Sequence, residues 1–428
     1  MSCDLDILKV KDFVDVTDYV ANGSFAALKD NVTYCDKPDY AVLVRLADHN
    51  SGWQNDLVYV DENSYKFLKK SSVQPGDVII SNVGANAGTV FRAPDLGLPM
   101  TLGPNSVLLK PKEDTPEARD FLYYFFSSPK GQHSLKSILS GSAQPKFNKT
   151  DLRNTEIVVP KGIPLAKVTG VLKSLDEKIT LNLLNNQTLE EIAHSIFKSW
   201  FVDFDPVKAK MNGEQPEGMD AATASLFPEK LVESELGLIP EGWEVGALSS
   251  VVDVIMGQSP KGSTYNDQNE GTPLVNGPVE FGVYHPVAQK WTTAPTKMSK
   301  NKDLIVCVRG STTGRYVVSD GEYCLGRGVC SIRSNDFPSF ANYLFKSELN
   351  SLLHLTTGST FPSWSGPTLK NFKVVVPPET IIEKFELLIG KLCEMMARNT
   401  GQNETLSTLR DTLLPKLLSG EIELVEQS

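Results

Sequence analysis

The sequence lacks the features that anchor, cross-link or metallate a protein. Its six cysteines form no C-x-x-C pair and its five histidines form no H-x-x-x-H, so neither a disulfide framework nor a metal site is indicated. No window of about 18 residues is continuously apolar, and the start MSCDLDILKVKDF lacks the basic then apolar layout of a signal peptide. We therefore expect a cytosolic (cytoplasmic) protein with reduced thiols.

Motifs of common nucleotide and nucleic-acid enzymes are also missing. The chain has no G-x-x-x-x-G-K-[ST] phosphate loop, no [ND]-P-P-[YFW] amino-methyltransferase motif and no E-x-K tripeptide of metal-dependent nucleases. The spaced glycines Gly84 and Gly88, like Gly326 and Gly328, precede no obvious helix start, and we interpret them as tight strand connections. The sequence therefore predicts no catalytic residue.

Negative charge is in modest excess. The chain has 42 Lys and Arg against 52 Asp and Glu, for a net charge of −10. Phosphate contacts usually leave a basic footprint, so this balance argues against simple nucleic-acid binding. Most of the excess lies in residues 161–240 and 378–428, however, so the remaining residues are nearly neutral and leave room for a local basic patch.

The chain is an internal repeat. GDVIISNVGANAGTVF (76–91) matches KDLIVCVRGSTTGRYV (302–317), and both copies have the pattern strand, glycine turn, strand. GSAQPKFNKTDLRNTEIVVP (141–160) matches GSTFPSWSGPTLKNFKVVVP (358–377), and both end in a β-branched run stopped by proline. The repeat predicts two similar globular domains of mixed α/β (α+β) class.

A long heptad repeat follows each copy. Apolar residues step alternately by three and four along residues 165–200 and 382–417, as in a coiled-coil seam. Such a helix is ~54 Å long, and alone it would leave its stripe in water, so we expect the two helices to pack together. The predicted organisation is a globular domain (1–160), a long helix (161–205), a linker (206–241), a second globular domain (242–377) and a second long helix (378–420).

Both heptad repeats place asparagine at two seam positions. Asn182 and Asn186 occupy them in the first repeat, and Asn399 and Asn403 occupy the equivalent positions in the second. A seam asparagine can fix register, because slipping would set an amide against leucine. In an antiparallel pair Asn182 faces Asn403 and Asn186 faces Asn399. A parallel pair also matches them, and we take the antiparallel coil, with pseudo-two-fold symmetry, as the hypothesis.

Polar residues that differ between the copies gather in corresponding loops. Arginine can hold guanine O6 and N7, amides suit adenine, and hydroxyls suit bases or phosphates, although chance surface placement rivals each single assignment. The proline-following aromatics Phe147 and Trp364 are interpreted as packing anchors rather than base-stacking platforms. The candidate DNA-binding residues are Asn82, Asn86, Arg92, Gln144, Lys146 and Lys149 in the first copy, and Arg309, Ser311, Thr312, Arg315, Arg327 and Arg333 in the second.

With these features the sequence resembles the specificity (S) subunits of type I restriction-modification enzymes. The resemblance covers nearly the whole chain and rests on the doubled architecture and on GSAQP and GSTFP before the two coils. Phe361 stands at the position equivalent to Gln144, so we assign that glutamine no shared role. The most characteristic phrases are EEIAHSIFKSWFVDFDPVKAKMNG (190–213), GLIPEGWEV (237–245) and LLPKLLSGEIEL (413–424).

The resemblance implies a noncatalytic subunit with two target-recognition domains, each reading one half of a split site in double-stranded DNA. It implies that the helices act as an antiparallel spacer and dock two modification (methyltransferase) subunits, with restriction subunits joining the complex. S-adenosylmethionine, ATP and Mg would be bound by those partners, and this chain would carry no cofactor. The docking residues expected on the helices are Phe197, Trp200, Phe201, Leu414 and Leu418.

Two other functions compete with this interpretation. One is a cytosolic coiled-coil repeat scaffold whose globular domains bind protein rather than DNA. The other is an enzyme with an unrecognised site, but a duplicated active site should repeat its polar residues. These copies repeat glycines and hydrophobes while their polar residues differ, which favours readers of two different targets.

Overall fold

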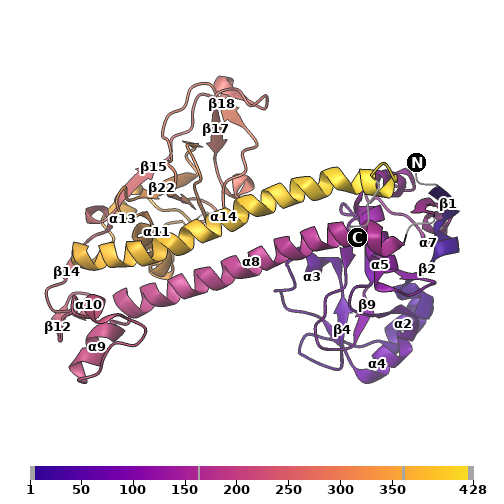
Figure 1. The fold of residues 1–428 in the computed structure, drawn as a ribbon, viewed down its shortest axis with the longest axis horizontal. Coiled ribbons are helices and arrows are strands. Elements are labelled where there is room, and N and C mark those ends of the chain that lie inside the picture. Colours follow the sequence, from indigo (N-terminus) through magenta and orange to yellow (C-terminus); the bar gives the residue numbers. More distant parts are fainter. Residues whose placement is uncertain (1–4, 162–163, 359–361, 423–428) are drawn as a thin grey trace, which may run out of the picture. The chain divides into compact units, whose positions relative to one another are not determined.

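The computed structural model describes residues 5–161, 164–358 and 362–422. The chain divides into two compact units (Figure 1): unit 1 is Met1–Thr180 with Asn403–Ser428, and unit 2 is Leu181–Gln402. Each unit contains one globular module and a part of each long helix. The predicted organisation instead assigned each helix whole to its own segment.

The main sheet of unit 1 is antiparallel and lies between two apolar layers. Its buried strand β7 alternates sides, so that Val78 and Ile80 pack with the helix that carries Phe121, while Ile79 packs with a second sheet. This explains why the strand is an unbroken apolar run rather than an alternating one. The strand order is β2 (Val14–Asp18), β10 (Ser106–Pro111), β7 (Val78–Ser81), β8 (Val90–Arg92).

The second sheet of unit 1 contains one parallel pair, β4 with β9, among antiparallel neighbours. Its order is β3 (Tyr34–Cys35), β5 (Tyr59–Val60), β4 (Ala41–Val44), β9 (Met100–Leu102), β6 (Ser72–Val73). A separate antiparallel pair joins β1 (Leu5–Lys9) to β11 (Glu156–Pro160). The helices of the module are α1 (Val10–Phe13), η1 (Tyr19–Asn22), α2 (Phe25–Asn31), α3 (Leu46–Asn50), α4 (Glu62–Phe67), η2 (Lys69–Ser71), α5 (Pro116–Ser127), α6 (Pro129–Ser137) and α7 (Lys149–Asn154).

Unit 2 repeats this topology in its main features. Its main sheet has the order β15 (Asp253–Met256), β22 (Val329–Arg333), β19 (Leu304–Cys307), β20 (Tyr316–Val318). The second sheet has the order β16 (Tyr265–Asn266), β18 (Trp291–Thr292), β17 (Thr272–Val275), β21 (Cys324–Leu325), again with one parallel pair, β17 with β21. The pair β14 (Glu244–Ala247) with β23 (Lys373–Val376) corresponds to β1 with β11. The helices are η3 (Leu248–Ser250), η4 (Gly262–Thr264), η5 (Pro278–Glu280), α11 (Pro338–Ser347), α12 (Leu349–His354) and α13 (Gly366–Lys370).

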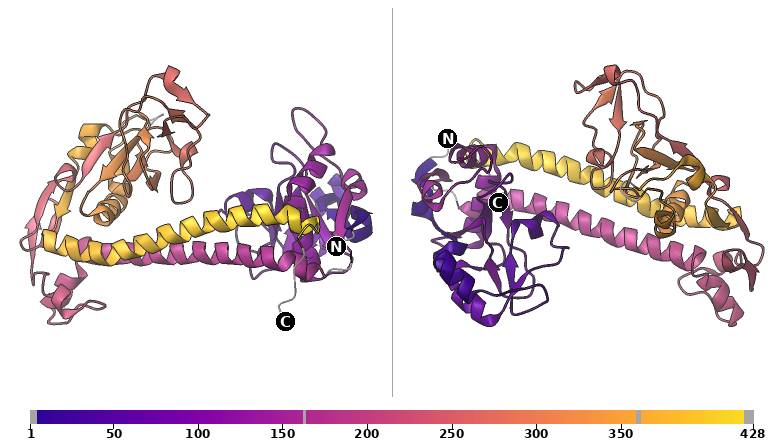
Figure 2. Two further views of the ribbon diagram at one scale, coloured as in Figure 1. Left: turned by 45° about the horizontal axis from the view of Figure 1, so that its top comes forward. Right: turned by 180° about the vertical axis from the view of Figure 1, so that it is seen from behind.

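The two long helices, α8 (Leu165–Phe201) and α14 (Glu379–Leu418), pair antiparallel within each unit (Figure 2). In unit 2 the rings of Trp200 and Phe385 lie 6.0 Å apart, so the end of α8 meets the start of α14. In unit 1 Val168 and Leu417 belong to one buried cluster, so the start of α8 meets the end of α14. The antiparallel hypothesis is therefore confirmed.

The seam asparagines are hydrogen-bonded across the coil. Asn399 donates through Nδ2 to Asn186 Oδ1 at 2.8 Å, as the antiparallel register requires. Asn182 is fully buried and donates to Gln402 Oε1 at 2.7 Å, next to the expected Asn403. Asn403 in turn donates to the backbone oxygen of Ile179 at 3.3 Å. Ile179 lies about one helical turn before Asn182, the partner expected for Asn403. Hydrogen-bonded polar groups thus occupy the middle of the seam.

The five residues expected to dock partners are instead part of the protein core. Phe197 is 1% exposed, because Phe340, Tyr343 and Phe385 surround its ring. The apolar side chains at the helix ends pack within each unit and are not available to a partner. The expectation that they dock modification subunits is therefore corrected. The buried residues are Phe197, Trp200 and Phe201 in unit 2 and Leu414 and Leu418 in unit 1.

The segment expected to be a linker is folded onto unit 2. It contributes Val207 and Phe227 to the main core, and the Phe227 ring lies 5.5 Å from Trp200. Its proline and glycine serve the turns between four short elements rather than an open connection. These are α9 (Asp205–Met211), α10 (Ala221–Ala224), β12 (Leu231–Ser234) and β13 (Gly237–Pro240).

Across the described ranges, no helix has the length and apolar character needed to cross a membrane.

Candidate nucleic-acid interface

In unit 1 the loop after β7 is hydrogen-bonded to the loop after α6. Gly84 donates its backbone N–H to Pro145 O at 2.9 Å, and Phe147 donates to Asn82 O at 3.1 Å. Gly84 has φ of 97°, which is the left-handed conformation that glycine adopts without strain. Gly84 and Gly88 lie between β7 and β8, and Gly326 and Gly328 lie between β21 and β22. The prediction that these four glycines form tight strand connections is confirmed.

Two further loops reach the same end of the sheet. Asn82 donates its N–H to Asn105 O at 3.1 Å, which brings in the β9–β10 connection. Gly103 donates to Val44 O at 2.8 Å, which brings in the loop after β4. Four loops therefore form one surface, which we call the loop edge of unit 1: residue 45 with residues 82–87, 103–105 and 140–147.

The same loop edge recurs in unit 2, where we define it as residue 276 with residues 308–313, 326–328, 357–358 and 362–364. Phe361, which stands at the position equivalent to Gln144, lies outside the described residues. The four equivalent hydrogen bonds, at 2.8–3.0 Å, run from Gly310 N to Pro362 O, from Trp364 N to Val308 O, from Val308 N to Gly328 O and from Gly326 N to Val275 O.

One aromatic side chain anchors each loop edge from below. Phe147 and Trp364 are both buried, and the indole N–H of Trp364 donates to Leu352 O at 2.8 Å. Neither ring is presented to a ligand, so their interpretation as packing anchors is confirmed. The anchors and backbone hydrogen bonds make each edge a defined platform rather than a set of loose loops.

Several predicted contact residues lie on these platforms. Asn86, Gln144 and Lys146 are on the edge of unit 1, and all three are exposed. On unit 2, Arg309 and Ser311 are exposed on the β19–β20 turn, with Thr312 partly buried. Arg315 at the end of that turn and Arg327 on the neighbouring loop are exposed as well. The structure thus brings together residues from loops that are distant in sequence.

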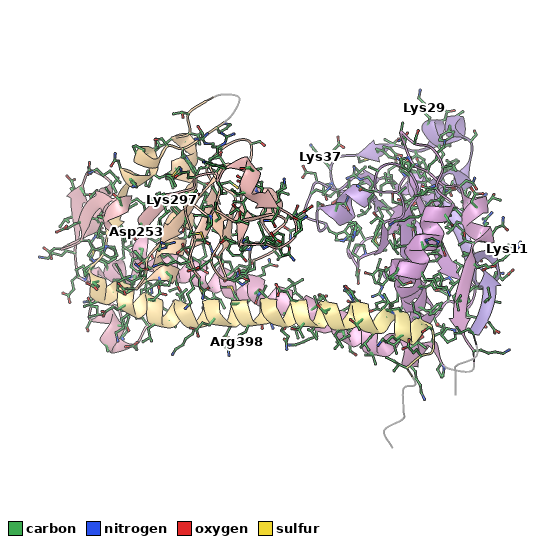
Figure 3. The ribbon with its side chains drawn as sticks, turned by 90° about the horizontal axis from the view of Figure 1, so that it is seen from above. Lys11, Lys29, Lys37, Asp253, Lys297 and Arg398 are labelled. Carbon is green, nitrogen blue, oxygen red and sulfur yellow. The ribbon has the colours of Figure 1, made fainter. Side chains whose placement is uncertain are left out.

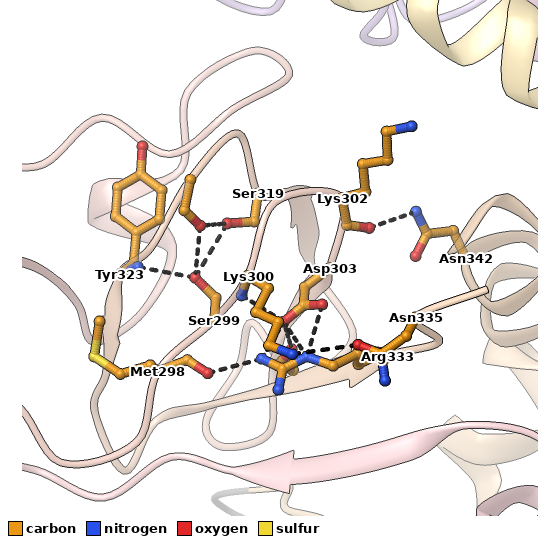
Figure 4. Close-up of polar contacts among 12 residues, drawn as sticks. Met298, Ser299, Lys300, Lys302, Asp303, Ser319, Tyr323, Arg333, Asn335 and Asn342 are labelled. Atoms are coloured by element: carbon orange, nitrogen blue, oxygen red, sulfur yellow. Dashed lines mark hydrogen bonds and ion pairs between the residues drawn. The ribbon is translucent and has the colours of Figure 1, made fainter. Parts of the chain in front are cut away.

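Arg333 is not on the loop edge, and its assignment is corrected. Its Nη2 lies 2.7 Å from Asp303 Oδ2 and also donates to Met298 O at 2.9 Å (Figure 4). Asp303 is 3% exposed and also accepts from the backbone N–H of Lys300 at 2.8 Å. A buried carboxylate requires such partners, so Arg333 neutralises Asp303 and ties the turn before β19 to the end of β22.

Three assignments in unit 1 change for similar reasons. Arg92 pairs with Asp120 at 2.9 Å, and its guanidinium carbon lies 4.1 Å from the centroid of the Tyr123 ring. Lys149 pairs with Asp18 at 2.7 Å. The Nδ2 of Asn82 donates to the backbone oxygen of Phe147 at 3.2 Å. These side chains hold elements of unit 1 together, because each one satisfies a neighbouring acceptor.

Sequence reasoning missed Arg45, Asn105 and Asn276, which all lie on the loop edges. Asn105 is exposed and has φ of 66°, a conformation that asparagine tolerates. Its loop, LGPN (102–105), matches LGRG (325–328) in unit 2, so a finer comparison of the two copies would have found it. Arg45 donates through Nε to Asp48 at 3.1 Å, and this hydrogen-bonded carboxylate raises the pKa of Arg45.

Two other features describe the chemistry near the edge of unit 2. Burial raises the pKa of the Cys307 thiol to about 11, which keeps it protonated and unreactive at neutral pH. Lys297 is exposed, and its backbone oxygen accepts from Leu325 N at 2.7 Å beside the edge (Figure 3). Among the described residues, no three His, Cys, Asp or Glu side chains are grouped to hold a metal ion. The edges offer hydrogen-bond donors and acceptors.

Comparisons with known proteins agree on one family. The family model described as type I restriction modification DNA specificity domain matches residues 4–193 and again 240–385. A putative type I restriction enzyme MjaX specificity subunit of Methanocaldococcus jannaschii is 25% identical over 97% of this chain and 93% of its own length. The HindI specificity subunit of Haemophilus influenzae is 26% identical over 82% of this chain and 88% of its own.

A solved structure shares the fold. The type I restriction-modification S subunit from M. genitalium is 14% identical, with a TM-score of 0.53 over 99% of this chain and 97% of that one. At this identity the likeness concerns the fold alone. The two matches to one family model each cover one globular module and part of the long helix that follows it.

Proposed function

Because the chain belongs to the family of type I restriction modification DNA specificity domains, we propose that it selects the DNA site at which a type I restriction-modification complex acts. The observation that carries this proposal is the pair of loop edges, which share backbone hydrogen bonds but differ in side chains. Such a pair suits two different half-sites of one bipartite target in double-stranded DNA. Each edge reads one half.

The chemistry of each edge suits contact with base edges. The edge of unit 1 presents the amides of Asn86, Asn105 and Gln144, which can pair with adenine N6 and N7. The edge of unit 2 presents arginines, which can pair with guanine O6 and N7. Nearby cations such as Lys146 and Lys297 supply phosphate contacts that position the module without reading sequence.

Two modification subunits dock on the long helices. Exposed apolar side chains stand there at equivalent positions, since the alignment of the two copies that matches Asn182 to Asn399 also matches Val171 to Leu388 and Ile192 to Leu409. Each unit therefore presents one such residue from α8 and one from α14. These side chains, rather than the buried docking residues first expected, are suited to an apolar partner surface. Two equivalent sites favour two copies of one partner.

The chain acts without a cofactor of its own. S-adenosylmethionine, ATP and Mg are bound by the modification and restriction subunits, which carry out methylation and cleavage. This chain contributes the choice of site. Its acidic balance suits that division, because the partners can add phosphate contacts to the few that this chain supplies.

The methylated sequences of cells that express this chain with its modification subunit test the proposal. We expect a bipartite motif with adenine methylation in each half. Replacing residues 1–160 with another first module should change one half and leave the other intact. DNA methylation that does not depend on sequence would contradict the proposal. So would a module exchange that alters both halves of the motif.

A further inference from the structure

Two arginines, Arg309 and Arg327, lie in the neighbouring loops at the end of the central strand pair of unit 2. Strands β19 and β22 are antiparallel with Cys307 opposite Val329. The hydrogen bond from Val308 N to Gly328 O, at 2.9 Å, continues that register by one step. The ladder ends there, because Arg309 bridges to Ser363, and Arg327 lies in the turn closed by the hydrogen bond from Val329 N to Gly326 O at 3.2 Å. Each arginine therefore lies one residue from the bond that joins the two loops.

The backbone around both arginines is held in place. Gly310, which follows Arg309, donates its N–H to Pro362 O at 2.9 Å. Arg327 donates its N–H to Ser259 Oγ at 3.2 Å. On either side of Arg327 only glycine fits, since a Cβ at Gly326 would lie 1.7 Å from Asn276 Oδ1 and one at Gly328 would lie 2.2 Å from Asn276 O. The side chains project from a fixed base.

The two guanidinium groups have no carboxylate to neutralise them. In the described ranges neither Arg309 nor Arg327 forms an ion pair, whereas Arg333 is paired with Asp303 and Arg45 with Asp48. Both side chains are exposed, so in the free protein their charges are turned to solvent. An external ligand with acceptor atoms would pair with them.

Unit 1 cannot present the same pair. Its register sets Ser81 opposite Ser106, and the hydrogen bond from Asn82 N to Asn105 O continues it. The positions equivalent to Arg309 and Arg327 are occupied by Val83 and Pro104, whose side chains donate no hydrogen bond. The arginine pair is thus a difference between the two edges at structurally equivalent positions.

We propose that Arg309 and Arg327 each hold one guanine, so that the half-site read by unit 2 contains two neighbouring G·C pairs. This inference rests on the proposed function. A guanidinium donates two parallel hydrogen bonds to guanine O6 and N7 in the major groove. Successive base pairs rise by about 3.4 Å, and the hydrogen bond of 2.9 Å from Val308 N to Gly328 O holds the two loops close enough for both side chains to reach neighbouring base pairs. One arginine therefore serves each of two adjacent steps.

Substitution of the pair tests this assignment. In the complex with the modification subunit, Arg309→Gln and Arg327→Gln should each relax selection at one guanine of the same half-site by roughly 5- to 100-fold. Selection in the other half should not change. Lys370→Gln is the matched control, because it removes one exposed positive charge from unit 2 at the end of α13, near η3 and away from the edge. It should leave selection unaltered.

A second test leaves the protein unaltered. Replacing guanine by 7-deazaguanine at the two positions removes the N7 acceptor, and should weaken binding by the wild-type complex there and at no other guanine of that half. Uniform weakening of all sequences by either arginine substitution would identify a phosphate contact and overturn the inference. A bipartite target without adjacent G·C pairs would overturn it while leaving the proposed function intact, whereas sequence-indifferent binding would overturn both.

Discussion

Replacing Arg333 with glutamine is expected to destabilise unit 2 without changing the bases that it selects. Asp303 is almost fully buried, and Arg333 donates to it from Nε at 3.0 Å and from Nη2 at 2.7 Å. Removing one partner of a buried ion pair costs about 3–5 kcal/mol, because the other charge stays buried. Since the Arg333 side chain is 14% exposed, water can replace part of the interaction, and we expect about 3 kcal/mol.

Unit 1 offers a matched comparison. Asp77 is the equivalent of Asp303 and is also buried, but its nearest arginine contact, from Arg119 Nε, is 3.5 Å long. Burial raises the pKa of Asp77, in keeping with weaker neutralisation. Arg119→Gln should therefore cost less, about 1 kcal/mol. Arg309→Gln should cost little, since its side chain is exposed.

Urea unfolding followed by tryptophan fluorescence measures these effects. Four of the five tryptophans, all except Trp53, lie in unit 2, so the signal reports mainly on that unit. Arg333→Gln should lower the unfolding midpoint while the methylated sequence stays the same. The reasoning is refuted if Arg333→Gln keeps the wild-type midpoint and relaxes base selection, because Arg333 would then contact DNA rather than Asp303.

Single contacts lead to three other predictions. Asn186→Leu alone should lower the free energy of unfolding by about 1–3 kcal/mol because it strands the amide of Asn399. The double change with Asn399→Leu should recover most of that loss, and an equal loss in the double variant would contradict the pairing. Burial against Phe91 lowers the pKa of His49, so unit 1 should be fully stable above the ordinary value of 6.5 and lose stability as pH falls below it. His49→Phe should flatten that dependence in an acid titration, and a wild-type profile would exclude His49 as its source. Ile192→Lys with Leu388→Lys should leave one bound modification subunit by native mass spectrometry, and two would exclude this docking surface.

The parts of the structure that the sequence predicted are those carried by periodicity. The heptads located both long helices, and the repeated seam asparagines led to the pairing of Asn186 with Asn399. Side-chain partners were harder to foresee. Arg333 and Arg309 lie close together in the chain, yet one is paired with Asp303 and the other is exposed. The difference arises because Arg333 meets Asp303, which is 30 residues away in the chain. The residues next to each arginine in the sequence do not indicate such a partner.

The two modules also make the same type of hydrogen bond to α8 through carboxylates at positions that are not equivalent. In unit 1 the hydroxyl of Tyr124 on α5 donates to Asp176 at 2.7 Å, and in unit 2 that of the equivalent Tyr343 on α11 donates to Glu190 at 2.8 Å. Both carboxylates belong to α8, but the residue that the internal repeat matches to Asp176 is Cys393 on α14. Each anchor therefore joins a module to the coil from a different position.

This arrangement bears on the exchange of modules. A replacement for residues 1–160 removes Tyr124 but keeps Asp176, which is also bound by Arg410 at 2.9 Å. A new module must supply a hydroxyl at that position, or it leaves one carboxylate oxygen without its protein donor. We expect modules with tyrosine there to be exchanged without loss of stability. Tyr124→Phe in the present chain should reproduce the defect of a module that lacks it, at about 1 kcal/mol, because only the hydrogen bond is removed.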